Sequence, residues 1–222
     1  MKNKIITIVF SLVFITGLSL CIYGIFDMYQ DNHQQEEVIE ITKEELKNNL
    51  TDEKKEDKKP IDAETKIDEL PKEEFKKTIK EGTYGLLTIP SINVEVAVSL
   101  GITDNVLNYF AGVYPVSEMP GTIGGNTAIA AHSMIPGYKV CPQCYFDEIG
   151  NIPIGGEIEL MWHDGYTYKY KVVESYMYED IAADYPFNKI EDKSLLTLVT
   201  CTNGDSNYRT YVIAEMVDKV KS

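Results

Sequence analysis

One cysteine of this 222-residue chain stands where a nucleophile would be useful. Cys201 follows the apolar stretch Leu195–Val199, which predicts a strand buried on both faces. The strand closes on Thr200 and Cys201, and the turn-forming residues Asn203–Asn207 follow directly. A thiolate at such a strand end is able to attack a carbonyl carbon and form a covalent acyl intermediate. The chemistry that this pattern predicts is acyl transfer.

The chain has a single arginine, and it lies close to this cysteine in the sequence. A second strand is predicted to resume at Arg209, and a hairpin would put Cys201 and Arg209 on neighbouring rungs. Opposed side chains on one face have Cβ atoms about 5 Å apart. A guanidinium there is able to favour the thiolate or to hold a developing oxyanion. The pattern leaves open an ordinary surface arginine in a hairpin.

A thiol nucleophile also needs a base, and the chain has three histidines. His33 lies in a highly charged segment and is interpreted as a solvated side chain. His163 precedes an Asp-Gly pair and is interpreted as a turn residue. His132 ends the apolar stretch Thr127–Ala131 at the start of a loop, where side chains can face a shared cleft. Periodicity alone leaves a base, a ligand and a packed histidine all open for His132.

Two further cysteines form the motif Cys141-Pro-Gln-Cys144, which fits a redox pair, half a zinc site or a local disulfide. A second Cys-x-x-Cys pair is missing, so zinc is disfavoured, and we expect no metal and no cofactor. We predict a disulfide in the loop after His132. The alternative function is a membrane-tethered thiol-disulfide oxidoreductase that uses Cys141 and Cys144.

The elements that must position these residues are mainly strands. Runs rich in Val, Ile, Thr and Tyr alternate with Gly, Pro, Asn and Asp after residue 82. The predicted strands are Tyr84–Ile89, Asn93–Ser99, Asn126–Ala131, Gly156–Trp162, Thr167–Tyr178, Ser194–Cys201 and Arg209–Val217. Residues 102–110 predict a short helix. With no repeat and no βαβ pattern, this indicates an all-β closed barrel or sandwich of about eight strands, one domain over 81–222.

The N-terminal part differs in composition. The stretch Ile5–Phe26 is apolar and uncharged, long enough for a helix to cross a bilayer, with lysines before it and aspartates after it. We predict a membrane anchor over 1–30 with the N-terminus cytoplasmic and the rest extracytoplasmic; a cleaved signal peptide is the alternative. The segment 31–80 holds 16 acidic residues and 11 lysines and predicts a charged, partly helical stalk whose last helix runs from Pro71 to Gly82. The net charge of −14 disfavours nucleic acid as a partner.

Three blocks of the sequence resemble the sortase family. The blocks are Gly85-x-Leu87-x-Ile89-Pro90, then Pro120-Gly121-x-x-Gly124-Gly125-Asn126 with Ile129–His132, and finally Thr197-Leu198-x-Thr200-Cys201 with Arg209 downstream. They occur in the order of the family and span the chain from Gly82 onwards. The likeness is closer to class A or D than to the pilin-polymerising class C, because no C-terminal transmembrane run is seen.

The resemblance implies a sortase-like barrel and a membrane-anchored cysteine transpeptidase of a Gram-positive cell surface. Cys201, His132 and Arg209 would carry the catalytic roles. Thr197 and Thr200 are predicted to bind substrate, and Thr197 alternates onto the strand face of Cys201. The implied partners are surface proteins with a sorting signal resembling Leu-Pro-x-Thr-Gly, cleaved between Thr and Gly. An amine of a cell-wall precursor or a pilin lysine would be the acceptor.

Overall fold

The computed structural model describes residues 2–51, 58–137, 141–180 and 187–222, and the side chains of 2–10, 27–28, 31 and 49–51 lie outside that description. The chain divides into two units, Met1–Glu36 and Glu37–Ser222. The first unit is the N-terminal part of helix α1, which runs from Lys2 to Thr51. The second unit holds the rest of α1 and all other elements.

No helix of the described residues has the length and apolarity required to cross a membrane. The predicted span at Ile5–Phe26 includes residues 5–10, whose side chains lie outside the description. The three-part division of the chain into anchor, stalk and catalytic domain stays a prediction.

The charged segment is more ordered than a solvated stalk. Val38 and Leu46, on the part of α1 in the second unit, are buried, as are Phe75 and Ile79 of helix α2 (Lys72–Gly82). Val38, Phe75 and Ile79 share one apolar cluster with residues of the strand domain. Glu45 is only 2% exposed and pairs with Lys58 at 2.6 Å. Scattered apolar positions among many charges therefore dock these helices, a result that net charge alone does not predict.

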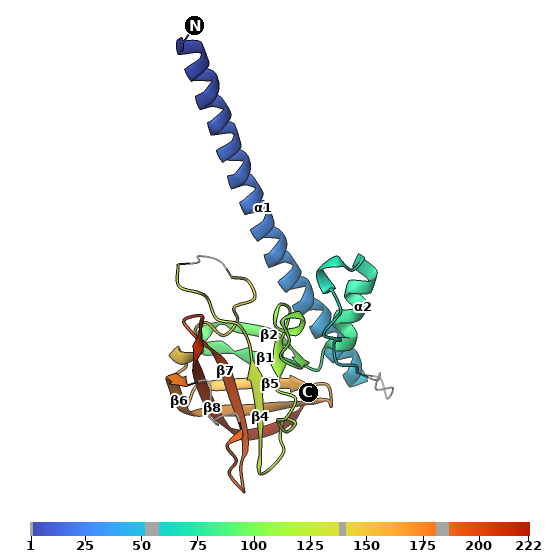
Figure 1. The fold of residues 1–222 in the computed structure, drawn as a ribbon. Helices are drawn as coiled ribbons and strands as arrows, with labels where there is room; N and C mark the ends of the chain where they lie inside the picture. Colours follow the sequence, from blue (N-terminus) through green and yellow to red (C-terminus); the bar gives the residue numbers. More distant parts are fainter. Residues whose placement is uncertain (1, 52–57, 138–140, 181–186) are drawn as a thin grey trace. The chain divides into compact units, whose positions relative to one another are not determined.

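The predicted all-β domain is an eight-stranded closed barrel (Figure 1). Its strands are β1 (Gly85–Ile89), β2 (Val94–Leu100), β3 (Ala111–Val113), β4 (Gly125–Ala130), β5 (Glu157–Trp162), β6 (Tyr166–Asp180), β7 (Ser194–Thr202) and β8 (Asp205–Lys221). Around the barrel they follow the order β1-β2-β3-β4-β7-β8-β6-β5. The pairs β2–β3 and β4–β7 are parallel, and the other pairs are antiparallel. A closed barrel leaves no sheet edge exposed to other chains.

Each predicted strand corresponds to a strand of the barrel. The sequence did not predict β3, which spans three residues and is too short to show an alternating pattern. The helix expected over 102–110 shrinks to α3 (Asp104–Leu107), and α2 starts one residue after Pro71, which caps it. Within the described residues the structure also contains the 3₁₀ helices η1 (Ile67–Glu69), η2 (Pro90–Ile92) and η3 (Ile149–Asn151).

The barrel interior is filled by large apolar side chains with almost no exposure. Examples are Leu87, Ile158, Leu160, Leu196 and Leu198. On β7 the even-numbered residues Leu196 and Leu198 belong to this core, whereas Val199 belongs to a separate cluster with Ala130 and Tyr211. Because side chains alternate along a strand, Cys201 lies on the face of Val199, outside the barrel core.

Candidate active site

Strands β7 and β8 form the predicted hairpin, and its register pairs Cys201 with Arg209. The connection is tighter than the turn-forming stretch Asn203–Asn207 indicates. Asn203 and Gly204 have φ of 48° and 68°, the combination required by a two-residue hairpin turn. Cys201 pairs with Arg209 and Thr202 pairs with Asp205, so residues 206–208 have no partner on β7 and form an irregularity in β8. The hairpin therefore closes directly beside the thiol.

The parallel ladder between β4 and β7 brings His132 to the level of Cys201. Its last pair is Ala130 with Val199, and the Ala131 N–H still donates to the Val199 carbonyl at 3.3 Å. Paired residues in a parallel ladder advance together, so His132 and Cys201 follow two residues later on the same face. Neighbouring strands lie about 4.8 Å apart. The register therefore pairs Arg209 with Cys201 and brings the end of β4, which leads into His132, alongside the end of β7.

The irregularity in β8 also holds the arginine side chain. Arg209 Nη1 donates to the carbonyl of Ser206 at 2.9 Å and to that of Tyr208 at 3.1 Å. Among the described residues, Arg209 forms no ion pair with a carboxylate. These two carbonyls hold the guanidinium in place, and its positive charge stays available to an anionic group near Cys201.

His132 is half-buried, and its pKa is lowered from the ordinary value by that burial. The negative charge of Asp104, the first residue of α3, opposes the shift by raising the pKa of His132. The neutral imidazole is therefore the favoured form of the free protein at neutral pH, and a protonated His132 would be a strong proton donor.

A tyrosine that sequence patterns did not single out belongs to the same face. Tyr114 follows β3 and packs on the cluster formed by Ala130, Val199 and Tyr211. Burial raises the pKa of Tyr114, the charge of Arg209 lowers it, and that of Cys201 raises it, so both groups act on its hydroxyl. A lone tyrosine after a three-residue strand carries no sequence signal that separates it from a core residue.

The two threonines predicted to bind substrate have buried hydroxyls in this structure. Thr197 is 0% exposed, and its hydroxyl donates to Asn126 Oδ1 at 3.0 Å. Thr200 is 5% exposed, and its hydroxyl donates to the Ala131 carbonyl at 2.8 Å. Both bonds join β7 to the strand that leads to His132. Substrate binding by these threonines stays a prediction.

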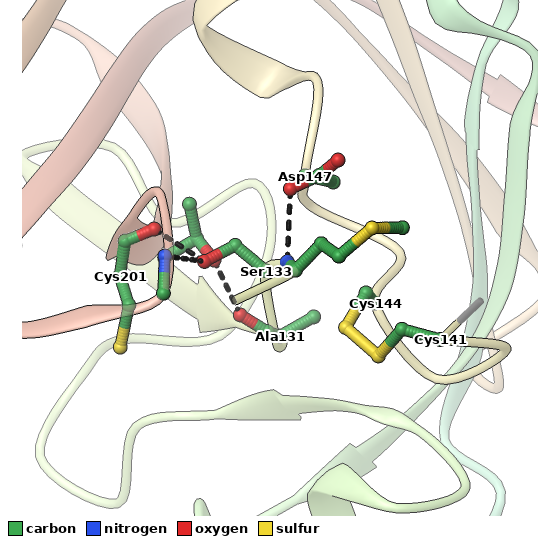
Figure 2. The surroundings of a disulfide bond; sticks show 9 residues. Ala131, Ser133, Cys141, Cys144, Asp147 and Cys201 are labelled. Carbon is green, nitrogen blue, oxygen red and sulfur yellow. Dashed lines mark hydrogen bonds between the residues drawn. A yellow bond between two sulfur atoms is a disulfide. The ribbon is translucent and has the colours of Figure 1, made fainter. Parts of the chain in front are cut away.

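Cys141 and Cys144 form a disulfide in the loop after His132 (Figure 2). The same loop is fixed to its own start, because Met134 N–H donates to Asp147 Oδ1 at 2.8 Å and Phe146 N–H to the His132 carbonyl at 3.1 Å. Among the described residues, no group of three or more His, Cys, Asp or Glu is placed to hold a metal ion.

A polar cavity of about 190 Å³ adjoins the end of β7. Its wall includes Thr200, Cys201 and Thr202 from β7 together with Asp147 and Glu148 from the loop that contains the disulfide. The backbone around Cys201 therefore borders open space as well as the barrel core.

Comparison with known proteins decides the family. Residues 87–217 match the family model described as the sortase domain, which is more than half of the chain. The chain belongs to the sortase family. No curated protein sequence matches this sortase. Membership implies the activity of a cysteine transpeptidase.

Solved sortases of several classes share the fold. Sortase C1 from Streptococcus agalactiae is 23% identical, with a TM-score of 0.55 over 63% of this chain and 69% of its own. A Clostridium perfringens sortase D5 transpeptidase is 26% identical, with a TM-score of 0.52 over 68% of this chain and 91% of its own. Listeria monocytogenes sortase A is 22% identical, with a TM-score of 0.54 over 64% and 91%. The likeness extends across classes and does not assign this sortase to one of them.

Proposed function

We propose that this sortase cleaves a C-terminal sorting signal resembling Leu-Pro-x-Thr-Gly and joins the released carboxyl end to an amine. The observation that carries the proposal is the strand register. It aligns Cys201 with Arg209 across β7 and β8, while the ladder between β4 and β7 runs up to His132. This register supports a site in which Cys201, Arg209 and His132 act together in acyl transfer.

In the first half-reaction, the Cys201 thiolate attacks the carbonyl carbon between Thr and Gly of the signal. The carbonyl oxygen becomes an oxyanion, and the Arg209 guanidinium stabilises it. Protonated His132 donates its proton to the leaving nitrogen as the C–N bond breaks. The products are a thioester on Cys201 and a free glycine amine. The lowered pKa of His132 makes it a ready donor once it is protonated.

In the second half-reaction, an amine attacks the thioester carbonyl. Its nitrogen gives a proton to neutral His132, the C–S bond breaks, and the thiolate of Cys201 returns. The acceptor is an amine of a cell-wall precursor or of a lysine on another surface protein. Water in place of the amine would give hydrolysis by the same steps.

The experiment is a transpeptidation assay with a signal peptide and an amine acceptor. Cys201→Ala should lower the rate by at least about 10³-fold, because the covalent step is lost. Arg209→Lys should cost about 10²-fold, because lysine lacks the planar donor fork. Cys21, the other free cysteine of the described residues, supplies the control, and Cys21→Ala should keep the wild-type rate. Full activity of Cys201→Ala, or no cost of Arg209→Lys, would remove the assigned roles.

We propose in addition that the enzyme works at the plasma membrane, with the N-terminus cytoplasmic and the barrel outside. The proposal rests on the uncharged stretch Ile5–Phe26 and on the exposed apolar side chains that the first unit carries, such as Phe14 and Leu20. Fractionation of cells that make the full chain tests it. The protein should pellet with membranes, and the barrel should be accessible to protease added to protoplasts. Recovery in the soluble fraction would refute this location.

A further inference from the structure

The residue after the histidine is tied to the cysteine. Ser133 is 8% exposed, and its hydroxyl donates to the Cys201 carbonyl at 2.5 Å. The hydroxyl oxygen of Ser133 also accepts a hydrogen bond from the Gly204 N–H at 3.2 Å. One hydroxyl therefore joins the loop that begins at His132 to both the end of β7 and the turn that follows it (Figure 2).

The two partners of Ser133 lie where the ladder between β7 and β8 breaks. The register shift falls between Cys201 and Thr202, and Gly204 is in the turn with a positive φ. Backbone groups at such an irregularity need partners from outside the ladder, because unpaired buried N–H and C=O groups are costly. The Ser133 hydroxyl supplies one donor and one acceptor at this place.

The turn is also packed tightly on the same loop. A Cβ atom on Gly204 would lie 2.6 Å from Ile135 Cα, closer than real Cβ atoms approach. The loop after His132 and the turn after Cys201 are therefore in close contact. The Cys201 sulfur points away from Ser133 in Figure 2, so the serine contacts the backbone and leaves the thiol to the substrate.

We infer that Ser133 is a positioning residue, which sets the separation of the His132 imidazole and the Cys201 thiol through hydrogen bonds to Cys201 and Gly204. The inference rests on the proposed function. A displacement of about 1 Å between reacting groups is able to cost about 10²-fold in rate. Such a residue should affect the chemical step and leave substrate binding unchanged, because its buried hydroxyl is used in hydrogen bonds to the backbone of Cys201 and Gly204.

The test compares Ser133→Ala with Ser133→Thr, which keeps a hydroxyl. Ser194 supplies the control, since it is a buried serine at the other end of β7, about 23 Å from Cys201 at 3.3 Å per residue. In the transpeptidation assay, Ser133→Ala should lower kcat by about 10- to 100-fold with KM for the signal peptide within twofold. Ser133→Thr should recover most of kcat, and Ser194→Ala should keep it.

A second measurement needs no sorting signal. The rate at which iodoacetamide alkylates Cys201 is followed against pH, and the midpoint should move in Ser133→Ala but not in Ser194→Ala, because His132 no longer sits at its place beside the thiol. If the wild type cleaves no signal peptide and the midpoint of the alkylation profile still moves in Ser133→Ala, the proposed function is wrong and the positioning role of Ser133 is supported. If the wild type is active and Ser133→Ala changes neither kcat nor the midpoint, the inference about Ser133 is wrong.

Amide hydrogen exchange of the wild-type protein covers the case in which Ser133→Ala does not fold. The Gly204 N–H should exchange far more slowly than the amides of exposed turns, because it donates to Ser133. Exchange of the Gly204 N–H at the rate of an unprotected amide would overturn the inference that Ser133 holds this turn.

Discussion

Replacement of Thr200 by valine removes one buried hydroxyl and keeps the shape of the side chain. The hydroxyl donates to the Ala131 carbonyl at 2.8 Å, and both residues are at most 5% exposed. Loss of the donor leaves a buried carbonyl without that bond, at a cost of about 1–3 kcal/mol. The equilibrium constant for unfolding should therefore rise by about 5- to 150-fold, because about 1.4 kcal/mol corresponds to each factor of ten. Because Ala131 precedes His132, kcat should fall while KM stays the same.

Urea unfolding followed by circular dichroism measures this loss of stability. The slope of the free energy of unfolding against urea concentration should stay unchanged, which shows that only stability has changed. Thr88→Val is the matched control, since Thr88 lies on β1 and its hydroxyl has no hydrogen-bond partner in the part of the chain that the structure describes. The control should stay within about 0.5 kcal/mol of the wild type. A Thr200→Val protein with wild-type stability and a raised KM would refute the reasoning and support a substrate contact for Thr200.

Three other changes test separate parts of the account. Asp104→Asn removes the charge that raises the pKa of His132, so the limb of the pH–rate profile that reports His132 should move to lower pH; an unmoved limb would show that Asp104 does not act on it. Glu45→Gln removes the carboxylate partner of the buried Lys58 ammonium, which keeps its hydrogen bond to the Lys80 carbonyl, and should cost about 3–5 kcal/mol of stability near neutral pH. Burial raises the pKa of Glu45, but Lys58 and Lys80 lower it by more, so the pKa in the folded protein lies below the ordinary value for glutamate. The stabilisation is therefore present above the ordinary pKa and is lost as the pH falls through the folded-state pKa. Urea titrations in which the stability difference between variant and wild type does not shrink in acid would contradict this. Replacing Cys141 and Cys144 together by serine should leave transpeptidation within about fivefold, whereas complete loss of activity would favour the oxidoreductase alternative.

Much of the barrel was predictable because its strands are local patterns. Alternating or continuous apolar runs between turn residues located β7 and β8, and the pairing of Cys201 with Arg209 followed from the turn between them. The turn itself differs from the expectation. An Asn-Gly pair closes a hairpin in two residues, and the extra residues of β8 bulge out instead of lengthening the loop.

Other features depend on contacts between distant segments and have no local signal. The ladder between β4 and β7 joins residues about 70 positions apart, so the level of His132 relative to Cys201 was expected only from a family resemblance. The charged segment was predicted to be a partly helical stalk, and its composition does not reveal that Val38 and Glu45 are buried, because a few apolar and paired positions are enough to dock a helix. Ser133 is an ordinary polar loop residue until the fold places it against Cys201.

In the proposed reaction, the Cys201 thiol carries the acyl group of the sorting signal. Intact-mass spectrometry of the full chain mixed with a Leu-Pro-x-Thr-Gly peptide, quenched in acid before an amine is added, tests it directly. We expect an added mass equal to the peptide up to its threonine, located on the fragment with Cys201, absent in Cys201→Ala and discharged by an amine. A protein that cleaves the peptide with no adduct, or with the adduct on another residue, would contradict it.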